Sequence, residues 1–246
     1  MKKELKRQIK QDELREGVQH AGQWAVGHSD ELRIGVLVAA VIVVLVGGIV
    51  YFQQHRKAQA ERAFSDAAQV YHAQVKGEQV EPAPAPTSGE TYANDKEKYE
   101  KAKGAFEGVY RRYGATAAGQ RARYYAALSA MELGQYADAD KELREIAAKS
   151  GDSLEPALAR LALAESARRQ GHAQEAIEAY RKLVEDTRQP LPRDHALMRL
   201  ASLLEETEKR AEARAAYRQL AEEFPRSVYA AQARARADAL DTAQQG

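Results

Sequence analysis

Three stretches of equal length decide the fold. They read ALSAMELGQYADADKELREI at residues 127–146, AESARRQGHAQEAIEAYRKL at 164–183 and ASLLEETEKRAEARAAYRQL at 201–220. Each stretch begins 37 residues after the one before it, and each has alanine at its first and thirteenth positions. A repeat of this kind predicts a row of similar units that bury their apolar faces against one another.

The repeat has further registers, some of which reach upstream to a fourth copy. Small residues recur at Ala127, Ala164 and Ala201 and at Ala102, Ala139, Ala176 and Ala213, while larger ones recur at Phe106, Leu143, Tyr180 and Tyr217 and at Val109, Ile146, Leu183 and Leu220. Small side chains let two paired helices approach closely, and the larger ones fill the space between neighbouring pairs. The sequence therefore predicts an all-α solenoid of helical hairpins.

Glycines mark two of the predicted turns within hairpins. Gly134 and Gly171 lie where a tight turn requires a backbone with positive φ. The third unit has Glu208 at this point, so we expect its turn to be less regular.

A long apolar run precedes the repeats. Residues 34–52, IGVLVAAVIVVLVGGIVYF, are 19 in number and carry no charge. As a helix they would extend about 28 Å, close to the thickness of a bilayer's hydrocarbon core. The run predicts a transmembrane helix, the alternative being a buried core helix. Seven basic residues precede it, and we expect them to hold the N-terminus on the cytoplasmic side.

These features divide the chain into five segments. We expect a cytoplasmic tail at 1–33, a transmembrane helix at 34–52, a post-membrane helix at 53–76, a Pro-rich loop at 77–93 and a repeat domain at 94–246. The repeat domain should end in a capping helix over 227–240 with a polar outer face.

The sequence offers little for catalysis. It has no cysteine, its formal net charge is +1, and its six histidines form no metal-ligand spacing. Nucleophile elbows, phosphate-binding loops and dinucleotide fingerprints are absent from it. We therefore expect no enzyme activity, no cofactor, no metal and no nucleic-acid partner.

The repeats resemble a known family. LGQYADADKEL, QGHAQEAIEAY and KRAEARAAY, followed by Phe224-Pro225, are similar to tetratricopeptide repeats, which place small residues at their eighth and twentieth positions and a large one at the twenty-fourth. The aromatic usual at the fourth position is replaced by Arg123, Arg160 and Leu197. The unit is also three residues longer than the usual 34.

The order of the segments resembles one group within that family. A charged tail, one span, a helix, a Pro-rich loop and degenerate repeats are similar to the YfgM-like ancillary subunits of the SecYEG translocon. This resemblance implies a membrane-anchored scaffold in the bacterial inner membrane, with its repeats in the periplasm and with the Sec translocon and periplasmic chaperones as partners. Two alternatives stay open: a cell-envelope assembly or signalling scaffold, and a non-catalytic subunit of a membrane enzyme complex.

The tetratricopeptide resemblance also implies a partner-binding groove, lined by the first helix of each hairpin. Its positions fall on Arg121, Tyr124, Leu128, Leu161, Arg168, His195 and Met198. We expect Arg121, Arg168 and His195 to be exposed, whereas Leu161 could face the groove or pack against the next helix. This mixture of apolar and charged side chains would suit a peptide partner.

Overall fold

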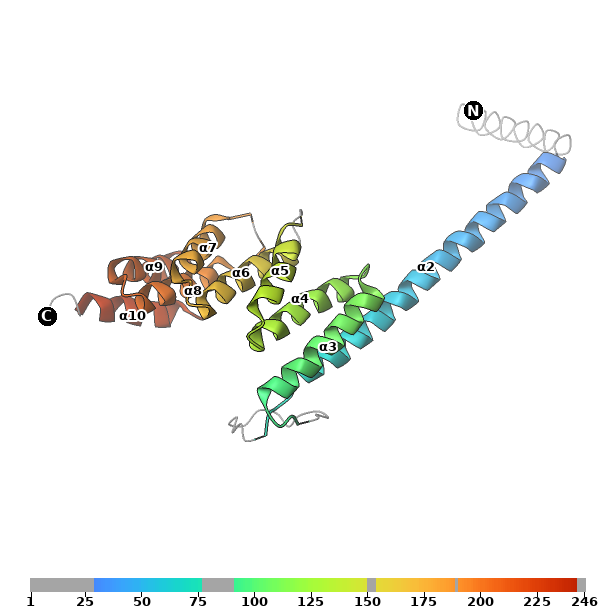
Figure 1. Ribbon diagram of the computed structural model, residues 1–246. Coiled ribbons are helices and arrows are strands. Elements are labelled where there is room, and N and C mark those ends of the chain that lie inside the picture. Colours follow the sequence, from blue (N-terminus) through green and yellow to red (C-terminus); the bar gives the residue numbers. More distant parts are fainter. Residues whose placement is uncertain (1–28, 77–90, 150–153, 189, 243–246) are drawn as a thin grey trace, which may run out of the picture. The chain divides into compact units, whose positions relative to one another are not determined.

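The computed structural model describes residues 29–76, 91–149, 154–188 and 190–242, although not the side chains of 29–36 and 39. The described residues form α-helices joined by short turns (Figure 1). The helices are α2 Ser29–Tyr71, α3 Asp95–Tyr113, α4 Ala117–Glu132, α5 Tyr136–Ala147, α6 Leu154–Arg169, α7 Ala173–Glu185, α8 Arg193–Glu206, α9 Arg210–Glu223 and α10 Ala230–Thr242. The chain divides into two compact units, Met1–Arg56 and Lys57–Gly246.

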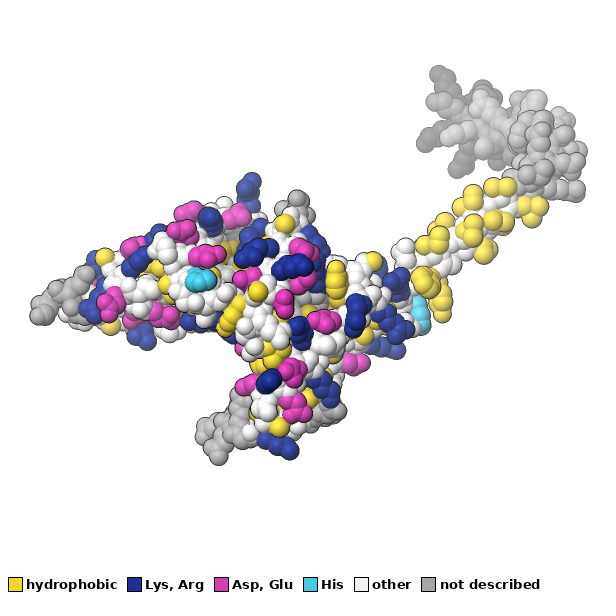
Figure 2. Space-filling model, viewed as in Figure 1, with side chains coloured by type: hydrophobic (Ala, Val, Ile, Leu, Met, Phe, Trp, Pro, Cys, Tyr) yellow, Lys and Arg dark blue, Asp and Glu magenta, His cyan; other side chains and the backbone are white. Residues whose placement is uncertain are grey.

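The described part of the first unit is helical and contains the apolar run. Its large apolar side chains are exposed from Leu37 to Phe52, and Figure 2 shows hydrophobic side chains spread along this part of α2. In the part of the chain that the structure describes, no helix has both the length and the apolar character needed to cross a membrane. The expected tail lies mostly outside the described residues, which begin at Ser29.

The expected boundary between a helix at 53–76 and a loop at 77–93 is corrected. Helix α2 ends at Tyr71, and residues 74–76 run beside Tyr92 instead. Tyr92 N–H donates to the Gln74 carbonyl at 3.1 Å, and Lys76 N–H donates to the Tyr92 carbonyl at 3.0 Å. These two bonds satisfy backbone groups on both sides of the Pro-rich segment, whose residues 77–90 lie outside the described set.

Helices of the second unit stack in sequence order. Each of α3 to α9 contacts the helix that follows it, and α4 also contacts α6 in the next hairpin. The first hairpin pairs the part of α2 after Arg56 with α3, where Ala60 and Ala67 share a buried cluster with Ala102 and Phe106. The predicted solenoid of helical hairpins is confirmed.

The repeating registers form the core. The four small residues of the second helices, Ala102, Ala139, Ala176 and Ala213, are completely buried. The larger residues four and seven positions later are also buried in all four copies, at 0–6% exposure. The pattern read from the sequence is therefore the packing pattern of the solenoid.

Local features define both ends of the repeat region. Asn94 Oδ1 accepts a bond from Glu97 N–H at 2.9 Å and caps the start of α3, while Glu97 Oε2 accepts a bond from the N–H of Ala93, the residue before the cap. At the other end, α10 buries Ala233, Ala237 and Leu240 against the solenoid. Most of its remaining side chains are exposed, so a capping helix with a polar outer face is confirmed, starting at Ala230.

The expectation of a less regular turn at Glu208 is wrong. Glu208 adopts φ 58°, close to the 72° of Gly134 and the 79° of Gly171. Lys209 N–H donates to the Leu204 carbonyl at 2.8 Å, the same five-residue bond that follows both glycines. Packing of α8 against α9 thus imposes the same C-terminal turn on Glu208. Because Glu208 has a Cβ, its backbone is strained at positive φ.

This strain predicts opposite effects for two substitutions. Glu208→Gly should raise the free energy of unfolding by up to about 1 kcal/mol, because glycine tolerates positive φ. Gly171→Ala should lower it by about 1 kcal/mol for the same reason. Urea unfolding followed by circular dichroism measures both, and Arg199→Gly at an exposed position inside α8 serves as a control that should destabilise. A loss of stability in Glu208→Gly would contradict the assignment of strain.

Candidate functional site

The predicted groove residues lie on the first helices of three hairpins. Tyr124 and Leu128 lie on α4, Leu161 and Arg168 on α6, and His195 and Met198 on α8. Tyr124 and Leu128 are half-buried against one core cluster, whereas Leu161 and Met198 are half-buried against the next. The structure therefore brings these side chains together in two groups rather than in one row.

The charged residues expected to be exposed are only partly so. The Arg121 guanidinium pairs with Glu61 of α2 and lies 4.7 Å from the Phe64 ring centroid. Arg168 pairs with Glu165 at 2.8 Å on its own helix. The His195 ring lies 5.9 Å from the Tyr229 ring, and burial, followed by the nearby Arg199, lowers its pKa.

Ion pairs join each first helix to the next. Arg121 of α4 reaches back to Glu61 of α2, and the pairs that follow are Arg169 with Glu132 at 2.9 Å, Arg168 with Glu206 at 3.6 Å and Arg236 with Glu205 at 3.4 Å. These pairs link α2 to α4, α4 to α6, α6 to α8 and α8 to α10. Individually such partly exposed pairs contribute on the order of 0–1 kcal/mol, so their main effect is on the position of one hairpin against the next.

These four ion pairs, called the ion-pair ladder below, change which groove side chains are available to a partner. Two cations that seemed free in the sequence, Arg121 and Arg168, are already paired with carboxylates of the same chain. Tyr124, Leu128 and Met198 keep part of their apolar surface accessible. The groove positions therefore favour contact with apolar groups over charge-assisted contacts.

An aromatic cluster that the sequence did not predict lies at the N-terminal end of the repeats. The Tyr71 ring lies 5.4 Å from Tyr99 and 5.6 Å from Tyr125, and Phe64 lies 5.7 Å from Phe106. Burial raises the pKa of Tyr71. Phe64 and Tyr71 both lie on α2, and folding places them against rings from α3 and α4.

Arg123 occupies the position where the family usually has an aromatic residue. It is 9% exposed, and its Nε donates to Glu142 Oε2 at 2.7 Å while its Nη2 donates to Glu145. Its guanidinium lies 5.4 Å from the Tyr110 ring centroid. The side chain thus ties α4 to both α3 and α5 with a charge instead of a ring.

Glu165 is the most highly connected carboxylate of the groove side. It accepts bonds from Arg168 at 2.8 Å, from Arg169 at 3.1 Å and from the Tyr180 hydroxyl at 3.0 Å. Burial opposes its ionisation, but the bonds from the two arginines and Tyr180 outweigh it and lower its pKa to about 2. In the next unit Ser202 takes the corresponding position, and Glu205 accepts the equivalent tyrosine bond, from Tyr217 at 2.9 Å.

Among the described residues, no group of three or more His, Asp or Glu side chains is placed to hold a metal ion.

Comparison with known proteins gives the family. The model of the tetratricopeptide repeat-like domain matches residues 32–179, and a tetratricopeptide repeat model matches residues 195–227. The chain belongs to the tetratricopeptide repeat-like domain family. Tetratricopeptide repeats bind other proteins, so the chain is a protein–protein interaction scaffold. A comparison with the curated proteins returns no match.

One solved structure supports the fold. Two structures of a putative kinesin light chain from Podosopora anserina, with nearly identical tetratricopeptide-like repeats, are similar to this chain at 15% and 16% identity. Each match covers 61% of this chain and 80% of the other, with TM-scores of 0.50 and 0.49. At this identity the structure with the TM-score of 0.50 supports the repeat architecture alone.

The depressed pKa of Glu165 predicts a pH dependence of stability. In the unfolded chain this carboxyl titrates near its ordinary 4.5, and in the folded chain near 2. The folded state therefore gains stability from Glu165 above about pH 4.5 and loses it as the pH falls towards 2. Glu165→Gln should show a smaller loss of unfolding free energy between about pH 5 and pH 3 than the wild type.

Urea unfolding at each pH measures this difference. Glu178→Gln, on the exposed face of α7, is the matched control and should keep the wild-type slope. Equal slopes for Glu165→Gln and the wild type would contradict the role assigned to the three bonds.

Proposed function

We propose that the chain is a non-catalytic scaffold of the bacterial inner membrane, anchored by residues 34–52, with its repeats in the periplasm. One observation carries the anchor: a run of 19 uncharged residues whose described side chains are exposed. Val44 and Tyr51, for example, are each 73% exposed. Leaving such side chains in water costs roughly 1.5–3 kcal/mol each, and a lipid core would remove that cost.

No membrane-spanning helix is recognised among the described residues, and the proposal goes beyond that finding. Two further features support it. The family model begins at residue 32, so the apolar run belongs to the matched region together with the repeats. The seven basic residues before the run favour a cytoplasmic N-terminus. A long domain after a span crosses the membrane largely regardless of its own charge.

For the groove, we propose apolar segments of exported chains as partners, received beside the Sec translocon and passed to periplasmic chaperones. The paired arginines leave Tyr124, Leu128 and Met198 as the accessible contacts, which suits an apolar segment better than a charged one. Anchoring raises the effective concentration of such a weak site for chains emerging at the same membrane.

The anchor and its orientation are tested with single cysteines, since the chain has none of its own. Ala235→Cys lies on the exposed face of α10, and Gln8→Cys lies in the N-terminal segment. In intact bacterial cells an impermeant maleimide should label Ala235→Cys, and it should label Gln8→Cys only after permeabilisation. The reverse pattern would overturn the orientation.

Membrane integration has its own measurement. The full chain should stay in the membrane pellet during alkaline extraction, whereas Val43→Lys with Val44→Lys should release it, because each central charge costs about 2.5–3.5 kcal/mol. Arg62→Glu with Gln69→Lys, on the exposed surface after the run, is the control and should stay in the pellet. Release of the wild type would overturn the anchor.

The partner is tested by crosslinking from the groove. A photoreactive residue at Leu128 should crosslink to exported chains, whereas one at Ala231, on the outer face of α10, should not. Met198→Glu should reduce the Leu128 crosslinks severalfold, because it places a charge among apolar contacts. Equal crosslinks from both positions, or one stoichiometric enzyme as the product, would contradict the proposal and favour an enzyme subunit.

A further inference from the structure

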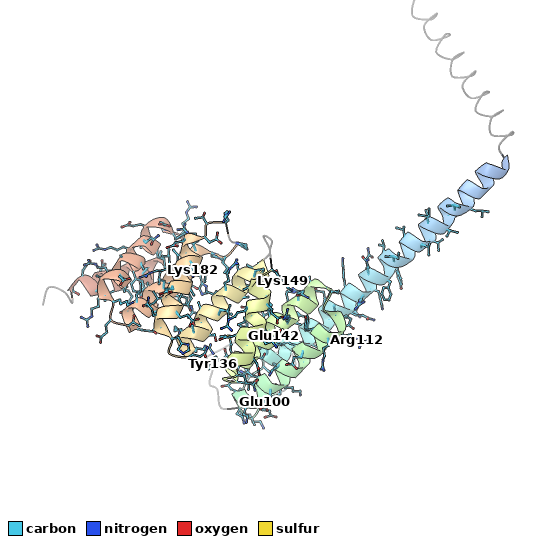
Figure 3. The ribbon with its side chains drawn as sticks, turned by 45° about the horizontal axis from the view of Figure 1, so that its top comes forward. Glu100, Arg112, Tyr136, Glu142, Lys149 and Lys182 are labelled. Atoms are coloured by element: carbon cyan, nitrogen blue, oxygen red, sulfur yellow. The ribbon has the colours of Figure 1, made fainter. Side chains whose placement is uncertain are left out.

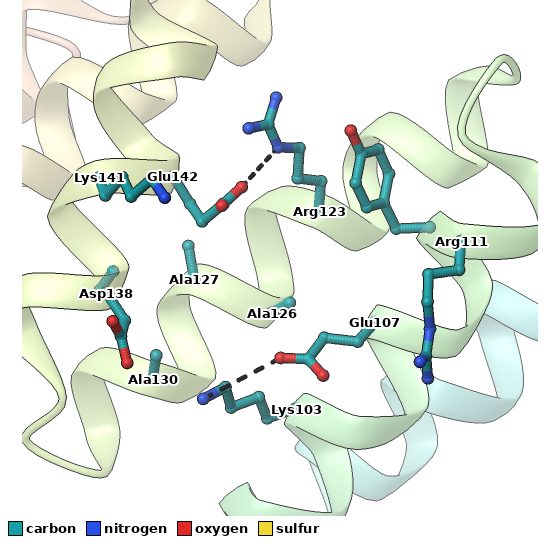
Figure 4. Close-up of a pocket in the computed structure, with 12 residues that line it drawn as sticks. Lys103, Glu107, Arg111, Arg123, Ala126, Ala127, Ala130, Asp138, Lys141 and Glu142 are labelled. Atoms are coloured by element: carbon teal, nitrogen blue, oxygen red, sulfur yellow. Dashed lines mark hydrogen bonds and ion pairs between the residues drawn. The ribbon is translucent and has the colours of Figure 1, made fainter.

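A pocket lies on the side of the second helices, where α3 and α5 flank α4. It has a volume of about 390 Å³, and Figure 4 shows Ala126 and Ala130 between walls that carry Lys103, Glu107 and Glu142. The floor is made of alanines of α4 and the walls of charged side chains from α3 and α5. Since the predicted groove residues lie at other positions of the first helices, this pocket is separate from the groove.

The next hairpin contains an equivalent pocket. It has a volume of about 360 Å³ and is lined by residues of α6 and α7, including Arg160 and Leu163. These two residues lie 37 positions after Arg123 and Ala126 of the first pocket. Glu142 of α5 and Lys182 of α7, one from each pocket, are labelled in Figure 3.

The third unit explains why the first two are open. Its residues at the same positions are Leu197 and Leu200, which are 0% and 6% exposed. Leu197 is packed in the core, whereas Arg160 is exposed and Arg123 turns towards its two glutamates. In the first two units an arginine therefore stands at the position where the third unit buries a leucine.

The spacing of the pockets selects the shape of an occupant. Helices α4 and α6 are in contact, and Ala126 and Leu163 hold equivalent positions on them, so the two pockets are offset by about 10 Å, the upper end of the usual separation of packed helices. In an extended strand about 10 Å is three residues, which places the two side chains on opposite faces. In an α-helix it is seven residues, which places them on the same face.

The charges around the pockets select a polarity. The lining of the first pocket carries one more cation than anions, and the exposed Arg111 and Lys141 form no ion pair within the described residues. The lining of the second carries one more anion than cations, with Glu175 and Glu178 exposed. Such a difference contributes modestly to affinity but sets the direction in which a partner binds.

We propose that this face docks an amphipathic helix of a separate protein partner. The helix inserts large apolar side chains at positions i and i+7 into the two pockets, with an acidic residue beside the first and a basic residue beside the second. The chain therefore has a second binding surface, which goes beyond the groove function and does not depend on it.

A stapled, fluorescent helical peptide of about two heptads with this pattern tests the proposal by anisotropy, titrated with the full chain in detergent. It should bind severalfold more tightly than a peptide in which glutamine replaces both the acidic and the basic residue. Lys141→Glu should remove most of that preference, because its side chain is exposed at the rim of the first pocket and the change leaves both rims acidic. Equal affinity of the wild-type chain for both peptides would overturn the proposal.

Filling the first pocket supplies a second measurement. Ala126→Trp should weaken binding at least tenfold, whereas Ala235→Trp on α10 should leave it unchanged, with thermal unfolding checking that both variants fold. Leu128→Glu should also leave it unchanged, which separates this face from the groove. If Ala126→Trp instead converts a dimer of the full chain to monomers, a second copy occupies the face and a separate partner is ruled out.

Discussion

The close approach of paired helices at their alanines is the constraint on which the repeat region depends. Ala102, Ala139, Ala176 and Ala213 have no exposed surface, and each is followed four residues later by a large buried side chain. A larger residue at any of these four positions would separate the helices and move that side chain out of its space. The solenoid therefore tolerates few substitutions at these repeated positions and many at the others. The remaining sequence accordingly differs between units.

Charged residues set the second level of organisation. Arginine–glutamate pairs between successive first helices compensate most of the charge that the groove side would otherwise present. Because such pairs are weak individually, they order the hairpins relative to one another more than they stabilise them. At the predicted groove positions Tyr124, Leu128 and Met198 keep accessible apolar surface, which supports the proposal of an apolar segment as the partner.

Arg123, Arg160 and Leu197 show how one repeated position can serve different purposes. As leucine it completes the core, as a buried arginine it joins α4 to α5 through two glutamates, and as an exposed arginine it leaves a pocket. A guanidinium cannot be buried without partners, so it turns towards carboxylates and leaves apolar space behind it. Divergence from the family pattern thus creates surface features instead of merely weakening the core.

The sequence by itself determined the helical class, the period, the buried registers and the capping helix, because a 37-residue repeat of small and large side chains has only one economical packing. It also placed Tyr124, Leu128, Leu161 and Met198, four of the seven predicted groove residues, against two core clusters, while Arg121 lies beside α2. Tertiary structure alone decided the turn at Glu208, the end of α2 at Tyr71, the aromatic cluster and the ion-pair ladder. Each of these depends on contacts between residues far apart in the chain, and spacing along a sequence does not specify which side chains meet across helices.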